Sequence, residues 1–147
     1  MFAILALALQ STLSATNVAA DVPMAVPATK PSFADEFDGP RVDTGKWLFD
    51  THRNRQGWHN NERQYYADGR PENIRIEKGA LVIEARRESL EGKVSDWGGQ
   101  AYTSGKLVTR QRYGYGFYEV RAKLPCGRGM WPAIWMLPIG EEWPGGG

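Results

Sequence analysis

Residues 113–138 constrain the fold of this chain more than any other stretch, because apolar side chains alternate with mostly charged ones along their first half. One face carries Tyr118, Val120, Ala122 and Leu124, and the other carries Phe117, Glu119, Arg121 and Lys123. A period of two is typical of a strand with one face on a core and the other in a polar environment. The sequence therefore predicts a β-strand over residues 117–124.

A turn and a return strand are predicted to follow. Pro125 has no N–H to donate to a sheet, and the glycines after it allow the backbone to reverse. Pro132 disfavours the helical region for Trp131, so Trp131 and Trp135 should share one face of the return strand. Two tryptophans beside a polar strand face indicate a cleft for a ligand with flat apolar surfaces and many hydroxyl groups.

The chain from residue 32 onward contains short apolar clusters separated by turn signals. Strands are predicted at residues 33–37, 47–49, 64–66, 74–76, 81–85 and 107–109. Lys78-Gly79 between two of these clusters predicts the clearest hairpin, and Asp38-Gly39-Pro40 predicts the turn that ends the first strand. No helical period and no internal repeat occurs after residue 20. The predicted class is all-β, a sandwich or jelly roll.

The residues suited to ligand binding are aromatic and polar. Tryptophan rings can stack on the C–H face of a sugar, whose hydroxyl groups need amide, carboxylate or guanidinium partners. The candidates are Trp58, Trp131, Trp135 and Trp143, with Asn60, Asn61, Glu62 and Gln64 in or beside the polar loop at residues 52–63. The alternatives are core packing for each tryptophan and turn formation for the asparagines. Composition alone indicates an all-β protein that handles carbohydrate.

Charge and cysteine content exclude other classes. Lys plus Arg number 18 against 17 Asp plus Glu, and this net charge of +1 gives no reason to expect nucleic acid or a membrane as partner. The single cysteine, Cys126, cannot form an internal disulfide or a multi-cysteine metal site. Neither the two histidines nor Ser104 has the surroundings of a zinc site or a hydrolase triad. We expect a monomer with no nucleic-acid and no membrane partner.

Residues 1–20 are predicted to be a signal peptide. The apolar run from Phe2 to Leu9 has the length of a signal-peptide core and is too short to span a membrane, and small residues precede Asp21. Residues 21–31 contain three prolines and are predicted to be a linker to a domain at residues 32–147. The protein is therefore expected to be secreted, to the extracellular space or the periplasm.

Six sequence blocks carry a resemblance to a known family. They are FADEFDG at 33–39, GWHNNERQYY at 57–66, YTSGKLVT at 102–109, YGFYEVRAKLP at 115–125, GMWPAIWMLP at 129–138 and WPGGG at 143–147. In this order they resemble glycoside hydrolase family 16, in its laminarinase-like branch of endo-β-1,3-glucanases. The resemblance implies a concanavalin A-like β-jelly roll of two curved sheets with a concave substrate cleft.

The resemblance also implies the parts of a site. A retaining glycosidase needs two carboxyl groups about 5 to 5.5 Å apart, and the family carries them in a Glu-x-Asp-x-x-Glu motif. That motif is expected immediately after Gly147, so the chain is expected to be the N-terminal half of a jelly roll without catalytic residues. The substrate-binding residues implied are Asn60, Lys106, Trp131, Trp135 and Trp143.

Two functions are compatible with this resemblance. One is a secreted endo-β-1,3-glucanase that acts on β-glucan polysaccharide without a catalytic cofactor. The other is a non-catalytic β-glucan-binding protein with the same jelly roll. The resemblance further implies a structural calcium ion in the full-length protein, with Glu36 and the backbone carbonyl of Gly79 among its ligands.

Overall fold

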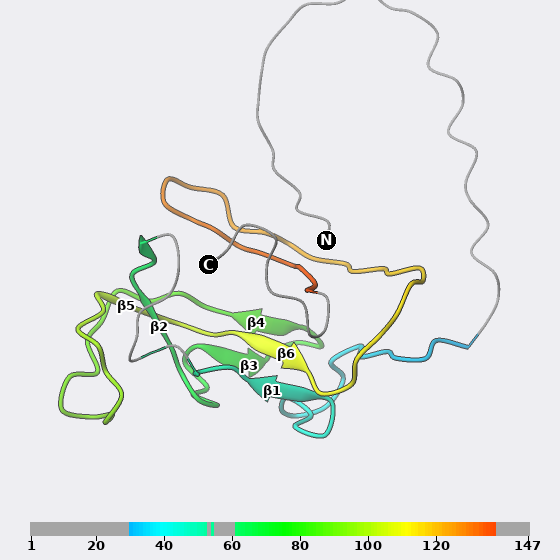
Figure 1. The fold of residues 1–147 in the computed structure, drawn as a ribbon, viewed down its shortest axis with the longest axis horizontal. Coiled ribbons are helices and arrows are strands. Elements are labelled where there is room, and N and C mark those ends of the chain that lie inside the picture. Colours follow the sequence, from blue (N-terminus) through cyan, green and yellow to red (C-terminus); the bar gives the residue numbers. More distant parts are fainter. Residues whose placement is uncertain (1–29, 53, 55–60, 138–147) are drawn as a thin grey trace, which may run out of the picture. The chain divides into compact units, whose positions relative to one another are not determined.

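The computed structural model describes residues 30–52, 54 and 61–137 of the 147-residue chain. Its regular elements are all β-strands (Figure 1), which confirms the predicted all-β class. They are β1 (Trp47–Phe49), β2 (Gln64–Tyr66), β3 (Ile74–Ile76), β4 (Leu81–Ile83), β5 (Tyr102–Ser104) and β6 (Leu107–Thr109). No helix among the described residues has the length and hydropathy that a membrane crossing requires. The predicted signal peptide and most of the predicted linker lie outside the described residues.

Two compact units divide the chain, and all six strands belong to the unit at residues 28–115. β1 pairs with β6 in antiparallel register, with Trp47 opposite Thr109. β2 pairs with β5 in parallel register, with Gln64 opposite Tyr102. β3 and β4 form an antiparallel pair in which Ile74 lies opposite Ile83. The described part of this unit therefore consists of three two-stranded sheets.

The predicted hairpin at Lys78-Gly79 is confirmed. Both residues have a positive φ, 54° and 70°, and the flanking Glu77 and Ala80 exchange backbone hydrogen bonds of 2.9 and 3.1 Å. Positive φ at both central positions defines the turn type whose twist matches that of two antiparallel strands. Glycine adopts this conformation freely, whereas Lys78 adopts it at a cost of about 1 kcal/mol.

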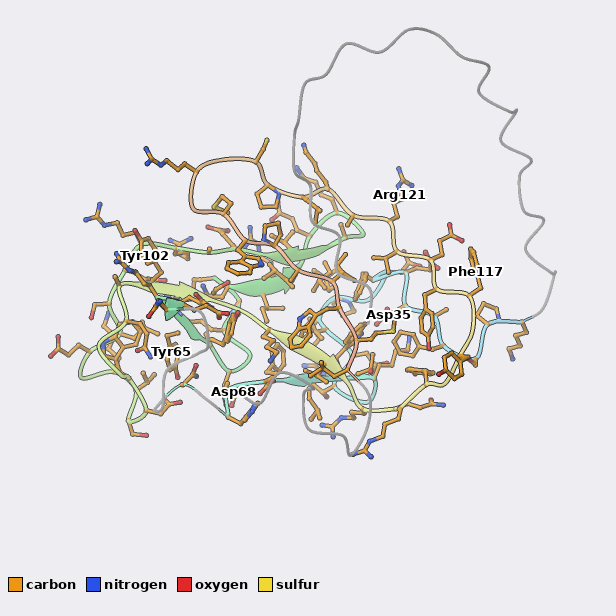
Figure 2. The ribbon with its side chains drawn as sticks, turned by 45° about the horizontal axis from the view of Figure 1, so that its top comes forward. Asp35, Tyr65, Asp68, Tyr102, Phe117 and Arg121 are labelled. Carbon is orange, nitrogen blue, oxygen red and sulfur yellow. The ribbon has the colours of Figure 1, made fainter. Side chains whose placement is uncertain are left out.

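The apolar core of this unit is small and lies beside β2. Tyr65 is 4% exposed and packs with Ala67 and Leu90, and its ring centroid is 5.3 Å from that of Trp97. Figure 2 marks the β2–β5 pair by Tyr65 on β2 and Tyr102 on β5. Burial of Tyr65, together with the bond from its hydroxyl to Asp96 at 2.8 Å, raises the pKa of Tyr65 to about 12. The hydroxyl therefore stays protonated and donates a hydrogen bond to the Asp96 carboxylate.

A buried polar cluster joins the hairpin to β5. Asn73 and Thr103 are both 0% exposed, and Asn73 Nδ2 donates to Thr103 Oγ1 at 2.8 Å and to the Glu84 carbonyl at 3.0 Å. Asn73 Oδ1 accepts from Arg70 at 2.8 Å, and Thr103 Oγ1 donates to Glu88 at 2.6 Å. Each of these groups is buried or half-buried and has a partner, which avoids the cost of an unsatisfied polar atom.

A continuous chain of alternating charges extends from this cluster. Its consecutive ion pairs have N···O distances between 2.6 and 3.5 Å. Arg70 binds Glu88 through two nitrogens, which is the strongest geometry for such a pair. The members in order are Glu72, Arg70, Glu88, Arg86, Glu84, Arg75 and Glu77.

The predicted strand at residues 33–37 is wrong. Phe37 has a φ of 58°, and its N–H donates to Asp35 Oδ1 at 3.1 Å. An aspartate that bonds to the backbone two residues further on forms a turn, and this local bond replaces the hydrogen bonds of a sheet. The residues 33–37 therefore form an irregular segment.

The predicted strands at residues 117–124 and after Trp131 are also wrong, although the predicted reversal between them is confirmed. Gly127 and Gly129 have positive φ values, and Met130 N–H donates to the Gly127 carbonyl at 3.3 Å. Within residues 116–137 no strand is formed, and the chain folds back on itself in Figure 1. Side chains of this segment, such as Phe117, stand out from the ribbon in Figure 2 and are exposed. Alternation predicts the two faces of a strand, but a strand also needs a hydrogen-bonding neighbour.

Candidate substrate-binding site

Lys106 lies immediately before β6, opposite the end of β1. The β1–β6 register places Phe49 opposite Leu107, so the next pair along the ladder is Asp50 and Lys106. The Asp50 N–H donates to the Lys106 carbonyl at 2.9 Å, which continues the antiparallel ladder by one step. Local strand pairing therefore fixes the backbone of Lys106 beside a carboxylate.

The two side chains form an ion pair with little exposure to solvent. Lys106 Nζ is 2.9 Å from Asp50 Oδ2, and the side chains are 18% and 13% exposed. The other oxygen, Oδ1, accepts from the His52 backbone N–H at 3.3 Å and contacts His52 Nδ1. Burial alone would raise the pKa of Asp50, but the bonds from His52 and Lys106 outweigh it and lower that pKa. Asp50 is therefore an anion held between two partners.

The predicted stacking residues Trp131 and Trp135 are exposed. Their side chains are 72% and 51% exposed, whereas Trp47 is half-buried. The Trp47 ring donates to Asp35 Oδ2 at 2.7 Å and packs edge-on against Phe33 at 5.5 Å. Trp131 and Trp135 thus present ring surface that a sugar could cover, and Trp47 has protein partners on its ring and on its nitrogen.

The predicted substrate-binding residues belong to two different units of the chain, and two of them lie outside the described residues. Lys106 belongs to the unit at residues 28–115, and Trp131 and Trp135 belong to the other unit. Asn60 and Trp143 lie outside the described residues. The assignment of these five residues to substrate binding stays a prediction.

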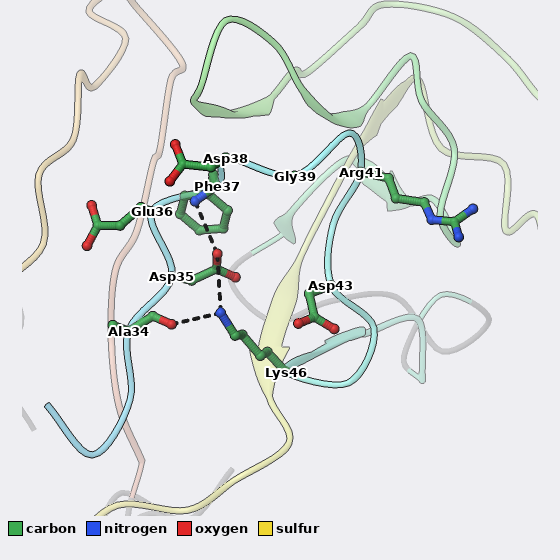
Figure 3. A pocket seen from close by; sticks show the side chains of 9 residues that line it. All are labelled: Ala34, Asp35, Glu36, Phe37, Asp38, Gly39, Arg41, Asp43 and Lys46. Atoms are coloured by element: carbon green, nitrogen blue, oxygen red, sulfur yellow. Dashed lines mark hydrogen bonds and ion pairs between the residues drawn. The ribbon is translucent and has the colours of Figure 1, made fainter.

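The residues predicted to bind calcium do not form an ion site by themselves. Glu36 lines a hollow that also contains Lys46 and Arg41, and Gly79 is not among its lining residues (Figure 3). In the same hollow, Lys46 Nζ lies 3.6 Å from Asp35 Oδ1, so the lysine ammonium group already pairs with the Asp35 carboxylate. The described residues contain no group of three or more side chains suited to a metal ion, and calcium needs six to eight oxygen ligands. Calcium binding by Glu36 and the backbone carbonyl of Gly79 stays a prediction.

The sequence motifs did not single out Asp50, whose carboxylate lies beside the Lys106 ammonium group. The signal that could have identified it is the antiparallel pairing of β1 with β6. Once residues 47–49 and 107–109 are paired antiparallel, the residues that flank them must face each other, and here they carry opposite charges. Opposite charges directly across an antiparallel pair are a recognised source of sheet stability. The pairing of the two strands, however, was not part of the sequence-based prediction.

The all-β class, the exposed tryptophans and the charged pair at a strand end together indicate a protein that handles carbohydrate. The sequence model described as "Glycosyl hydrolases family 16" matches residues 60–145. A β-glucanase of Rhodothermus marinus is 46% identical in an alignment 123 residues long, which covers 78% of this chain and 40% of that relative. A glucan endo-1,3-β-glucosidase of Cryptopygus antarcticus is 40% identical over 76% of this chain and 39% of the relative.

Among solved structures, that of SCLam, described as a non-specific endo-β-1,3(4)-glucanase from family GH16, is similar to this chain. It shares 57% sequence identity and superposes with a TM-score of 0.54 over 58% of this chain and 32% of SCLam. The chain belongs to glycoside hydrolase family 16. The jelly-roll class implied by the resemblance is thereby confirmed. The chain spans about 40% of the length of the β-glucanase and of the glucan endo-1,3-β-glucosidase.

Proposed function

We propose that this chain is part of a secreted endo-β-1,3-glucanase of the laminarinase type. The observation that carries the proposal is the family membership, because the relatives from Rhodothermus marinus and Cryptopygus antarcticus and the structure of SCLam are named as glucanases that act on β-1,3 linkages or on β-glucan. A β-glucan polysaccharide is therefore the proposed substrate. Cleavage is proposed to retain the configuration of the anomeric carbon.

The described residues would contribute substrate binding to this reaction. Trp131 and Trp135 offer exposed rings for stacking on glucosyl units, and aromatic contacts of this kind contribute about 1 kcal/mol beyond the burial of area. Lys106 would donate hydrogen bonds to sugar hydroxyl groups, and Asn60 and Trp143 complete the proposed set. Contacts that are stronger in the transition state than in the ground state would raise kcat. Contacts of equal strength in both states would lower only KM.

Bond cleavage would depend on two carboxylates that we place immediately after Gly147. One would attack the anomeric carbon and form a glycosyl-enzyme intermediate, while the other protonates the departing glycosidic oxygen. The second group would then act as a base and activate the water that hydrolyses the intermediate. No catalytic cofactor is required in this scheme.

The proposal is tested with the full-length secreted protein on four polysaccharides. Release of reducing sugar from laminarin is expected, with mixed-linkage β-glucan as a second substrate, and with agarose and carrageenan as controls that should not be cleaved. Proton NMR of the first products should show the β-anomer before mutarotation. Binding to laminarin without any cleavage would instead identify a non-catalytic glucan-binding protein.

Three further expectations belong to this proposal. The signal peptide at residues 1–20 would direct secretion, which N-terminal sequencing of the secreted protein can test. A structural calcium ion would involve Glu36 and the carbonyl of Gly79 together with ligands outside the described residues. The protein would act as a monomer.

A further inference from the structure

We propose that Asp50 is a positioning residue, which directs the ammonium group of Lys106 toward the bound glucan. This inference rests on the proposed function, because it assumes that Lys106 binds substrate. It concerns a residue that neither the motifs nor the alternation of the sequence singled out.

The first support is the backbone geometry. Asp50 and Lys106 are the next opposite pair of the β1–β6 ladder, and their backbones are joined by the 2.9 Å bond from Asp50 N–H to the Lys106 carbonyl. Opposite residues of an antiparallel pair have Cβ atoms about 4.5 to 5.5 Å apart, so the ladder keeps the starting points of the two side chains close together. The carboxylate is therefore at a fixed place relative to the lysine stem.

The second support is the way in which the carboxylate is held. Oδ2 contacts Lys106 Nζ at 2.9 Å, while Oδ1 accepts from the backbone N–H of His52 at 3.3 Å and contacts the ring of the same residue. The two His52 contacts hold one oxygen of Asp50 and leave the other oxygen facing the Lys106 ammonium group.

The third support is the chemistry of lysine. Its ammonium group is a point charge on a flexible four-carbon stem, in contrast to the planar fork of arginine, which is oriented by its own geometry. A lysine that binds a hydroxyl group in a defined direction needs an external anchor, and Asp50 supplies one. Both side chains are mostly buried, at 13% and 18% exposure, so this pair is screened less by solvent than a surface salt bridge.

A double-mutant cycle in the full-length enzyme tests the proposal. The variants are Asp50→Asn, Lys106→Gln and the two together, assayed for kcat and KM on laminarin with the folded fraction measured for each. Asp50→Asn is expected to lower kcat/KM about ten-fold, since a displaced contact can cost that much or more. In the Lys106→Gln background the same change should lower kcat/KM by less than about twofold, because Asp50 then has no ammonium group to direct.

Two further variants keep the result interpretable. Glu77→Gln removes an exposed ion pair to Arg75 of the same 2.9 Å length, and it should leave kcat and KM unchanged. Asp50→Glu keeps the charge but displaces it by one methylene, so it serves if the Asn variant does not fold. It should melt within a few degrees of the wild type while its kcat/KM stays below that of the wild type.

The outcomes distinguish failure of the proposed function from failure of the positioning role. If the wild type cleaves no β-glucan, the proposed function fails, and the positioning role fails with it. If the wild type is active and the Asp50 variants retain its kcat/KM per folded molecule, only the positioning role is overturned. An equal loss from Asp50→Asn in both backgrounds also overturns it, because Asp50 would then act independently of Lys106.

Discussion

Residues 30–115 and residues 116–137 differ in how many of their backbone and side-chain groups have partners. Within residues 30–115, short strands have partners, and a buried polar cluster and a chain of ion pairs connect the hairpin to β5. Residues 116–137 contain larger apolar side chains, but no strand is formed there, and all of the side chains are exposed. The comparison shows that apolar content alone does not produce sheet structure. Polar side chains with complete sets of partners hold the first part together.

The largest effect is expected from Asn73→Leu, which removes the centre of the polar cluster. The replacement leaves Thr103, Arg70 and the Glu84 carbonyl without this partner, and unsatisfied buried groups cost about 1 to 3 kcal/mol each. Urea unfolding of the full-length protein should show a loss of at least about 3 kcal/mol. Glu77→Gln, at the exposed end of the ion-pair chain, is the control and should change stability by less than about 1 kcal/mol. Equal effects of the two variants would contradict the role given to the cluster.

The next effect separates two tryptophans, one from each part. Trp47→Ala removes ring contacts to Phe33 and Phe37 and the bond to Asp35, so it should destabilise the protein by about 2 to 3 kcal/mol. Trp131→Ala, at an exposed ring, should leave the melting temperature nearly unchanged and lower kcat/KM on laminarin about ten-fold. Trp143→Ala is also expected to lower kcat/KM on laminarin about ten-fold. If Trp131→Ala destabilises the protein and leaves activity per folded molecule unchanged, Trp131 is a core residue.

Local signals in the sequence predicted the first part well. Strands β1 to β4 and β6 coincide with or fall within predicted strands, whereas β5 was not predicted. The Lys78-Gly79 turn is determined by residues that are adjacent in the chain. The failures have two physical causes. At residues 33–37 the Asp35 side chain accepts a hydrogen bond from the Phe37 backbone, and a turn forms in place of a strand. Composition does not show whether such a local bond or a sheet hydrogen bond will form. At residues 117–124 the alternation predicted a strand, but a strand also needs a hydrogen-bonding partner, and none is formed within residues 116–137.

The candidate site shows the same limit. Lys106 was assigned by resemblance, but its partner Asp50 is distant in sequence and becomes visible only when β1 and β6 are paired. Trp131 was predicted as a ligand-binding residue and Trp47 as part of an apolar cluster, and the side chain of Trp131 is exposed whereas that of Trp47 is half-buried. Long-range pairing is therefore the information that the sequence-based interpretation lacked.

A smaller effect is expected from acid, and it tests the ion-pair chain. Hydrogen bonds from Arg70 and then Thr103 outweigh burial and lower the pKa of Glu88 from 4.5 to about 2. Because the pKa is lower in the folded state, this carboxylate stabilises the protein above pH 4.5, and the contribution is lost as the pH falls toward 2. Unfolding free energy measured from pH 6 to pH 2.5 should therefore decline less steeply in Glu88→Gln than in the wild type. Parallel curves for the two proteins would show that Glu88 is not linked to folding in this way.

The smallest effect is expected from calcium. Removal of calcium by chelation should lower the melting temperature of the full-length protein by a few degrees, as expected for loss of about 1 kcal/mol. Glu36→Gln should reduce this shift, while Asp43→Asn, whose carboxylate lies in the same hollow and bonds to Gly45 N–H, should retain it. A melting temperature that is independent of chelation would remove the calcium site from this account.

The β1–β6 ladder has a consequence for the order in which the protein folds. The β3–β4 hairpin closes across two residues and can form within about 1 to 10 μs, whereas β1 must find the last described strand of its unit. Loop closure costs more entropy as the separation grows, by about 0.6 kcal/mol for each doubling, so we expect β1 and β6 to join late. The pair of Asp50 and Lys106 would then form after the rate-limiting step. Substitutions at Asp50 should accelerate unfolding and leave the refolding rate almost unchanged, which makes this pair a determinant of how long the native state persists.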